Sequence, residues 1–143
     1  MRFDLGRDLF EACQSGDLER VQEVLEKGDP SGLEWRNSAG LTSLHAAVES
    51  KNIEIIQRLI RAGAQLNVHG SIGDTPLHLA LHSYLEESPL EHGERKSRLE
   101  LTRVLLDAGA DPQARGSDGT TCIGLARLYQ AKEAERLLAL YIH

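Results

Sequence analysis

Two histidines one helical turn apart are the residues of this chain that most resemble a catalytic arrangement. His78 and His82 flank Leu79-Ala80-Leu81, and zinc proteases present two imidazoles from one helix at this i, i+4 spacing. Zinc catalysis also needs a third ligand and usually a glutamate base within the motif, but none of the three intervening side chains is polar. A metal-dependent enzyme that uses His78, His82 and the segment 84–99 is therefore the less favoured hypothesis.

Other catalytic patterns are missing from the sequence. Cys13 and Cys122 have no signature of a catalytic thiol around them, and neither a glycine-rich phosphate loop nor a Gly-x-Ser-x-Gly elbow occurs. His92, close to Glu91 and Glu94, could add a ligand only if its segment folded back. We therefore expect no enzyme, no catalytic residue, no metal and no cofactor.

Composition favours a helical, soluble domain. A chain of 143 residues with 41% apolar but only 4% aromatic side chains fits a single core of Leu, Ile, Val and Ala. The net charge of −6 argues against nucleic acid as a partner, because no broad positive surface is available. No apolar run approaches the roughly 18–20 residues of a membrane span. We expect reduced thiols at Cys13 and Cys122, a cytoplasmic or nuclear location and no membrane partner.

A repeated segment gives the strongest information on the fold. Thr42-Ser43-Leu44-His45-Ala46-Ala47 recurs 33 residues later as Thr75-Pro76-Leu77-His78-Leu79-Ala80, and a fixed period of this length indicates stacked repeats. Thr42 and Thr75 are expected to cap a first helix, and Asp17 and Asn52 a second one. Gly63 and Gly109 follow second helices and can end them in the left-handed conformation.

These residues resemble the ankyrin repeat, whose pattern runs Gly-x-Thr-Pro-Leu-His-x-Ala-Ala, a second amphipathic helix and Gly-Ala-Asp-x-Asn. The resemblance covers nearly the whole chain and implies an all-α solenoid of antiparallel helix pairs with projecting β-hairpin loops. It divides a single domain, 1–143, into a capping repeat 1–41, repeats 42–74 and 75–120, and a capping repeat 121–143. It also implies that His45 and His78 hydrogen-bond locally to tie successive units together.

One repeat is longer than the others. Gly63 and Gly109 are 46 residues apart, 13 more than the 33-residue period, and the extra residues fall near 84–99. Pro89 and Gly93 are expected to interrupt any helix there. Ser97 with Glu100 forms a capping box that predicts a second helix over 98–107. The inserted loop is either a tolerated surface loop or a segment that contacts a partner.

By the resemblance, loop tips and the exposed ends of the first helices line a concave face that binds a protein or peptide. The predicted contacts on the loops are Trp35, Arg36, Asn37, Leu41, His69, Ile72, Asp74, Asp118 and Thr120, and those on the helices are Gln14, Ser15, Glu49, Ser50, His82, Ser83, Leu128 and Tyr129, with Tyr84 extending this surface. Trp35, the only tryptophan, is the first candidate because tryptophan is enriched in binding hot spots. The alternative is that its ring packs over the first helix pair.

The function implied is that of a non-catalytic interaction module acting as an adaptor, an inhibitor or an assembly subunit. A narrower alternative is a small bacterial protein of the immunity or effector type. We expect a monomer, because Leu137, Leu138, Leu140 and Tyr141 are predicted to pack in the terminal core and not to form a dimer surface.

Overall fold

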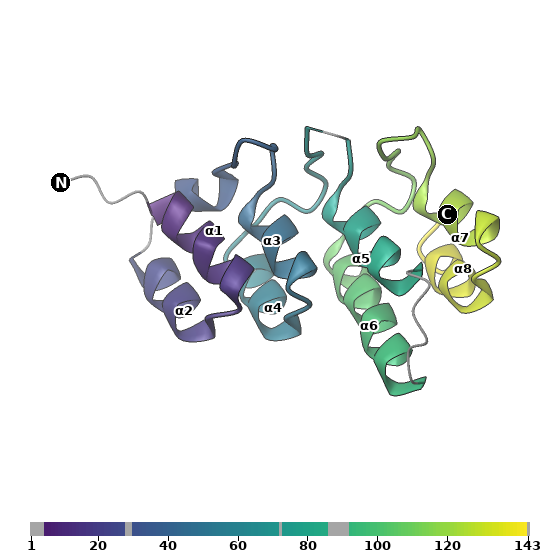
Figure 1. The fold of residues 1–143 in the computed structure, drawn as a ribbon, viewed down its shortest axis with the longest axis horizontal. Coiled ribbons are helices and arrows are strands. Elements are labelled where there is room, and N and C mark those ends of the chain that lie inside the picture. The colour runs from purple at the N-terminus through teal and green to yellow at the C-terminus, as the bar shows by residue number, and fades with distance from the viewer. Residues whose placement is uncertain (1–4, 28–29, 72, 86–91, 143) are drawn as a thin grey trace.

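The structure, a computed structural model, describes residues 5–27, 30–71, 73–85 and 92–142 (Figure 1). These residues form α-helices and one short 3-10 helix, and no strand. The elements are α1 (Leu5–Ser15), α2 (Leu18–Glu26), the 3-10 helix η1 (Pro30–Glu34), α3 (Ser43–Glu49), α4 (Ile53–Arg61), α5 (Pro76–Leu85), α6 (His92–Ala108), α7 (Cys122–Leu128) and α8 (Lys132–Ala139).

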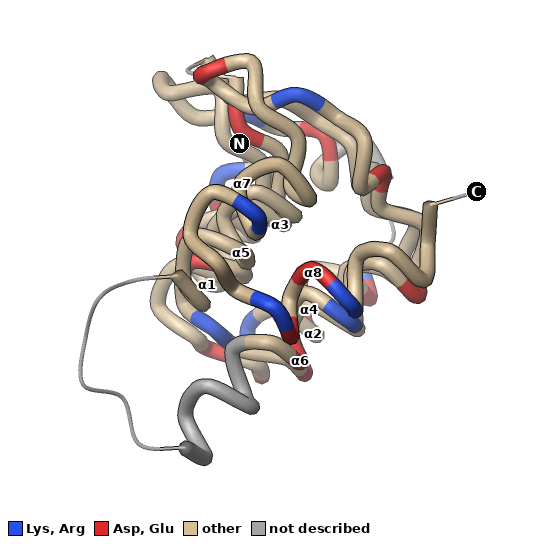
Figure 2. Tube along the Cα trace, turned by 90° about the vertical axis from the view of Figure 1, so that its right-hand side faces the viewer, with Lys and Arg blue, Asp and Glu red and all other residues tan. Residues whose placement is uncertain are grey.

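The helices stack in pairs along the long axis of the molecule. Figure 1 shows α1, α3, α5 and α7 side by side in one row and α2, α4, α6 and α8 in a second row. We call these the inner row and the outer row. The loops that connect one pair to the next all project from the same side, and the view along the stack in Figure 2 shows them above both rows. The expected stack of helix pairs with projecting loops is therefore confirmed.

Local capping explains where most helices begin. The side chains of Asp17, Asn52 and Thr121 accept hydrogen bonds from backbone N–H groups in the first turns of α2, α4 and α7, at 3.2, 3.1 and 3.1 Å. Thr42 caps α3, and Pro76 is the first residue of α5, where its missing N–H costs nothing. The caps at Asp17, Thr42 and Asn52 were predicted from the sequence and are confirmed, whereas the cap at Thr121 was not predicted.

Leucines at the same position of successive outer helices form the core. Leu59, Leu105 and Leu138 are all fully buried, and they occupy equivalent places in α4, α6 and α8. A single helix pair of this size buries too little apolar surface to offset its ordering entropy, so each pair depends on its neighbours.

The loops are tight turns without strand ladders. In each of three loops one N–H donates to a carbonyl four residues on, at 2.9–3.0 Å: Asn37 to Leu41, Gly70 to Asp74 and Gly116 to Thr120. Among the described residues the only β-type pairing is an isolated antiparallel bridge between Arg115 and Thr121. The projecting loops are therefore hairpin turns, and in the part of the chain that the structure describes they contain no extended strand.

The longer repeat differs from its prediction. Helix α6 begins at His92 and continues to Ala108, so the predicted break at Gly93 and the predicted start after Ser97 are both wrong. Glycine inside a helix costs only about 1 kcal/mol relative to alanine, less than an anchored helix gains from several added hydrogen bonds. Pro89 lies outside the described residues. The insertion therefore lengthens α6 into a projection below the stack (Figure 1).

Candidate interaction surface

The two buried histidines join neighbouring helix pairs. His45 accepts a hydrogen bond at Nδ1 from the Thr42 N–H at 3.1 Å, and its Nε2–H donates to the Asp74 carbonyl in the next loop at 3.1 Å. His78 makes the equivalent contacts to the Thr75 N–H at 3.4 Å and to the Thr120 carbonyl at 3.3 Å. The structural role predicted for both histidines is confirmed.

The buried position of the two rings also affects their ionisation. Burial lowers the pKa of His45 and of His78 below the ordinary value of 6.5, because a charged imidazole loses its water shell. Protonation at Nδ1 would also turn the acceptor of a backbone N–H into a donor. Both nitrogens of His78 are thus engaged in hydrogen bonds. This ring therefore cannot ligate a metal together with His82 without breaking a hydrogen bond that connects the repeat to itself or to the next one.

The thiols show no sign of a catalytic role either. Cys13 and Cys122 are buried and free, and burial raises the pKa of each thiol to about 12. A thiol with so high a pKa is a poor nucleophile at neutral pH. The described residues also contain no cluster of three or more His, Cys, Asp or Glu side chains placed to hold a metal ion. Glu91 lies outside those residues, and the side chains of His92 and Glu94 are not described.

Side chains also connect the loops to one another. Arg36 donates from Nη1 to the carbonyl of His69 at 3.5 Å, and His69 donates from Nε2 to the carbonyl of Arg115 at 3.2 Å. The Ser71 N–H donates to the Ala39 carbonyl at 2.9 Å. Arg36, His69 and Arg115 occupy the same place in three successive loops. The predicted contact residues Arg36 and His69 are exposed, but each also holds the next loop in position.

Asp74 requires a correction. It is only 6% exposed, so its side chain is not free to meet a partner as predicted. Its Oδ1 accepts a hydrogen bond from the Ser117 N–H at 2.9 Å, and His82 Nε2 lies 3.8 Å from its Oδ2. A carboxylate removed from water needs such donors. Asp74 therefore fixes the third loop and orients His82, which is exposed.

Trp35 also has a different role from the first one predicted. Its ring packs on Phe10 of α1, with ring centroids 5.5 Å apart at 57°. Gly6 allows this approach, because a Cβ there would lie 2.4 Å from Trp35 Cβ. Trp35 is half-buried and closes the first helix pair, so the alternative interpretation is the one that the structure supports.

The exposed positions of the inner row form a regular series. In α3 the six residues from Ser43 to Val48 are buried and Glu49 is exposed. The equivalent residues of the other inner helices, Gln14, His82 and Leu128, are exposed as well. Ser83, the neighbour of His82, is instead buried. We call Gln14, Glu49, His82 and Leu128 the inner-row series.

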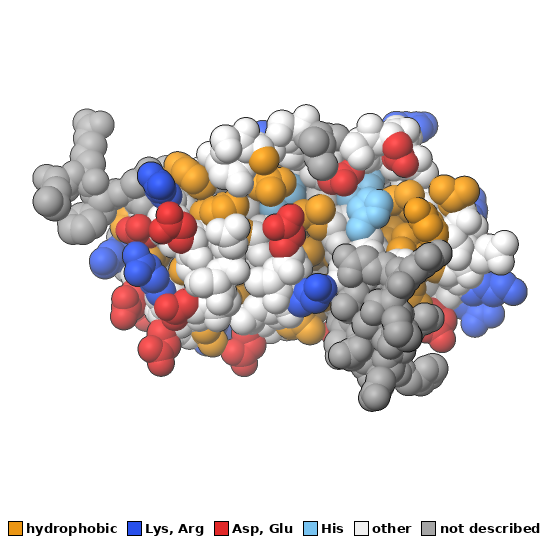
Figure 3. All heavy atoms as spheres, in the orientation of Figure 1, with side chains coloured by type: hydrophobic (Ala, Val, Ile, Leu, Met, Phe, Trp, Pro, Cys, Tyr) orange, Lys and Arg blue, Asp and Glu red, His pale blue; other side chains and the backbone are white. Residues whose placement is uncertain are grey.

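Apolar side chains are most exposed in the last helix pair. Leu128 is 71% exposed, Tyr129 55% and Leu140 73%. Figure 3, which views the molecule from the inner row, shows hydrophobic side chains gathered over α7 beside histidine, with acidic side chains on the side of the loops. Leu137 and Leu138 are buried as predicted, but Leu140 was wrongly expected in the core.

Four more of the predicted contacts fall into three groups. Asp118 is exposed, and hydrogen bonds from Thr120 hold the pKa of its carboxyl below the ordinary value. Leu41 and Tyr84 are half-buried and pack against the core. Ile72 lies outside the described residues.

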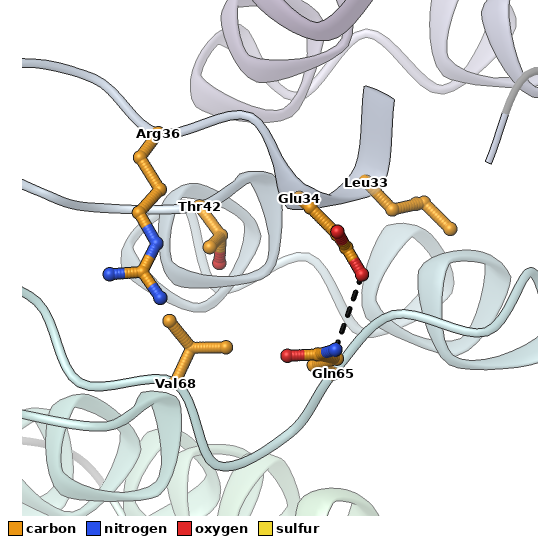
Figure 4. A pocket seen from close by; sticks show the side chains of 6 residues that line it. All are labelled: Leu33, Glu34, Arg36, Thr42, Gln65 and Val68. Atoms are coloured by element: carbon orange, nitrogen blue, oxygen red, sulfur yellow. Dashed lines mark hydrogen bonds between the residues drawn. The ribbon is translucent and has the colours of Figure 1, made fainter. Parts of the chain in front are cut away.

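A small pocket at the base of the first two loops was not predicted. Leu33, Glu34, Arg36, Thr42, Gln65 and Val68 line a space of about 150 Å³ (Figure 4). Gln65 Nε2 donates to Glu34 Oε1 at 3.2 Å across one side of it. This space is below the roughly 300–1,000 Å³ of ordinary small-molecule sites, and no sequence motif marks it. The exposed surface of the inner row and loops, and not a pocket, is the main feature of the molecule.

Comparisons with known proteins agree with this architecture. The ankyrin-repeat family model, in three copies, matches residues 9–116. A crystal structure of an ankyrin repeat domain from Acinetobacter baumannii superposes with a TM-score of 0.79 at 27% sequence identity, covering 93% of this chain and 63% of that one.

Curated relatives include proteins of several kinds. Over 119 residues the chain is 32% identical to the palmitoyltransferase Hip14 of Drosophila melanogaster, covering 82% of this chain and 16% of the enzyme. It is 31% identical over 106 residues to mouse protein phosphatase 1 regulatory subunit 27, covering 74% of this chain and 60% of that protein. It is 44% identical over 73 residues to mouse RelA-associated inhibitor, covering 50% of this chain and 8% of that protein. The chain thus spans less than two thirds of each of these relatives.

The structure adds one negative observation: no helix in the described ranges is long and apolar enough to cross a membrane. The repeats at the 33-residue period, the paired helices with buried histidines and the family match over 108 residues, from 9 to 116, lead to one conclusion. The chain belongs to the ankyrin repeat family, whose fold serves as a protein-interaction module and is generally not enzymatic.

Proposed function

We propose that this chain is a non-catalytic module that binds a protein or peptide partner through the inner-row series and the loop tips. The partner would lie across several repeats, touching the ends of α3, α5 and α7 and the loops beside them. The chain would act as a regulatory subunit, an inhibitor or an adaptor.

The observation that supports this proposal most directly is the composition of the inner-row series. Its four members occupy one structural position, yet they are a glutamine, a glutamate, a histidine and a leucine. Positions that hold the stack together repeat the same residue, as Leu59, Leu105 and Leu138 do. A position that is exposed in every unit and differs in chemistry is suited to recognising a partner, because its side chains have no packing role.

The rigidity of the loops is a second support. Hydrogen bonds join the first loop to the second, at Arg36 and Ser71, and the second to the third, at His69 and Asp74. A surface that is ordered before binding loses less conformational entropy in the complex. The row of loops can therefore contribute to the affinity even where each contact with the partner adds little binding energy.

The relatives suggest the kind of role. Two of them are a phosphatase regulatory subunit and an inhibitor associated with RelA. Both names describe proteins that act on another protein. We infer an analogous regulatory role for this chain, with a partner of its own.

The test is affinity purification with mass spectrometry, followed by binding measurements with the purified partner. Variants Glu49→Lys and His82→Glu change the charge of the inner-row series. Variants Glu23→Lys and Arg103→Glu make matched changes at exposed positions of the outer helices α2 and α6. We expect the first two to weaken binding about tenfold or more and the second two to have little effect. Loss of binding in only the outer-helix variants would contradict the proposal.

A further inference from the structure

The last two repeats carry an apolar surface with an acidic border. Leu128 and Tyr129 at the end of α7 are two of the three most exposed large apolar residues that the structure describes, at 71% and 55%. Single apolar side chains scattered on a surface are ordinary. Adjacent ones on a face whose side chains do not pack in the core indicate a contact site. This patch continues the inner-row series beyond His82.

The last repeat differs from the others in residue type at this patch. Tyr129 occupies the place of Ser15, Ser50 and Ser83, which are exposed, half-buried and buried in turn. An aromatic residue thus replaces the serine that stands at this position in the three preceding repeats. Tyrosine offers a large contact area at a small cost in side-chain entropy.

The charges beside the patch are acidic. Asp118 is exposed at the tip of the third loop, and the carboxylate of Asp74 lies under His82, with Oδ2 facing His82 Nε2 at 3.8 Å. Electrostatic interactions link Asp118 to His82 and Asp74 to His78, so these groups share one region between α5 and the third loop. Figure 3 shows this arrangement as acidic and histidine side chains adjoining the hydrophobic ones over α7.

Basic side chains nearby do not reverse this charge. Arg127 pairs with Glu135 at 2.9 Å on the end of the stack, and Arg115 donates to the carbonyl of Gly119 within its own loop at 2.8 Å. The whole chain also has a net charge of −6. A cationic group that approaches Asp118 is thus attracted both locally and by the charge of the whole molecule.

We propose that the patch formed by Leu128 and Tyr129, with Asp118 and His82 at its border, binds a partner segment that carries an apolar side chain close to a lysine or arginine. This inference rests on the proposed function and specifies the chemistry of the partner. The apolar side chain contacts Leu128 and Tyr129. The cationic side chain lies toward Asp118.

The experiment uses random linear peptides displayed on phage and selected on the immobilised full chain. Enriched peptides are synthesised, and their affinity is measured by fluorescence anisotropy for the wild type and for variants. We expect enriched sequences to combine an apolar residue with Lys or Arg. The double variant Leu128→Ala with Tyr129→Ala should weaken binding about tenfold or more. Asp118→Asn should weaken it about two- to fivefold, and by less when salt is raised.

Leu140→Ala is the matched control. Leu140 is as exposed as Leu128, but it follows α8, which runs antiparallel to α7, so it lies at the opposite end of the helix pair. Its replacement should leave the affinity unchanged. All of these substitutions are at exposed positions, so the variants should keep the fold, and circular dichroism would verify this.

Three results would overturn the inference. One is enrichment of neutral or acidic peptides, or of none. Another is binding that survives the double variant but is lost in Glu49→Lys, which would retain the proposed function and reject this patch. The third is concentration-dependent light scattering that Leu128→Ala abolishes, which would make a second copy of the chain the occupant. Binding lost only in the outer-helix variants would reject both proposals.

Discussion

The central and the last helix pairs use the same two structural positions in opposite ways. In the central pairs these positions hold buried residues, Val48 with Ile56 and Leu81 with Thr102. In the last pair they hold Arg127 and Glu135, whose side chains are 64% and 35% exposed and form an ion pair at 2.9 Å. Buried residues stabilise the contact with a following pair, whereas the charged pair leaves a solvated face. We therefore propose that α7 and α8 cap the stack, as expected from the sequence.

The largest expected effect concerns the core of this comparison. Leu59→Ala should lower the free energy of unfolding by about 2–5 kcal/mol, because it leaves a cavity between two neighbouring pairs. Leu138→Ala removes the equivalent side chain from the last pair, where α8 packs on α7 and α6. We expect a smaller loss there. Denaturant titration of both variants measures the difference, and equal losses would show that position in the stack does not matter.

The loops give a second comparison. Gly40 and Gly119 both adopt positive φ, +71° and +77°, but a Cβ on Gly40 would lie 2.7 Å from Ser71 N, whereas one on Gly119 meets nothing within 4 Å. Gly119→Ala should cost about 1–2 kcal/mol from backbone strain alone. Gly40→Ala should cost about 1 kcal/mol more, because it also pushes neighbouring loops apart. Thermal unfolding of the two variants tests this, and an equal shift would argue against packing between the loops.

The histidines of the central repeats predict a dependence on pH that the last repeat, with Gly124 at this position, does not share. In the unfolded chain the imidazoles of His45 and His78 have the ordinary pKa of 6.5, but burial lowers the pKa of both rings in the folded chain. The stability gained by keeping the two rings neutral is therefore fully present above about pH 6.5. As the pH decreases toward the folded-state pKa values, the free energy of unfolding falls by up to about 1.4 kcal/mol per pH unit for each ring. Urea midpoints at about pH 7.5 and pH 5.5 measure this.

A matched variant separates the histidines from other titrating groups. His45→Gln with His78→Gln removes both imidazoles while keeping groups that can donate and accept hydrogen bonds. The double variant should be less stable, but its urea midpoint should change less between the two pH values. An unchanged pH dependence would assign the effect to other residues.

The smallest effect on stability is expected at the last pair. Arg127→Leu with Glu135→Ile places apolar residues at the two charged positions. Loss of this exposed ion pair should change the free energy of unfolding by no more than about 1 kcal/mol. The new apolar face should, however, cause self-association, which light scattering over a concentration series would detect. A variant that stays monomeric would indicate that this face does not act as a cap.

Features that depend on a few neighbouring residues could be predicted from the sequence. Thr42, Asn52 and Asp17 cap helices because each needs only the N–H groups of its own first turn. The fixed 33-residue offset likewise located His45 and His78 at equivalent joins.

Features that depend on distant residues could not be predicted. The carboxylate of Asp74 accepts a hydrogen bond from the Ser117 N–H, 43 residues away in the next loop. Trp35 packs against Gly6 and Phe10, which belong to another element. The start of α6 was also mispredicted, because the Ser-x-x-Glu sequence pattern of a capping box also occurs inside longer helices, where no free N–H remains for the serine to cap. The inner-row series could be located from the repeat, but which of its members bind a partner depends on the partner.

Binding across the inner row and the loops can be mapped by hydrogen–deuterium exchange of the chain, free and bound to its partner. We expect increased protection in the loops at 37–41, 69–71 and 116–120 and at the C-terminal ends of α3, α5 and α7. Protection confined to the outer helices α2, α4, α6 and α8 would contradict this expectation.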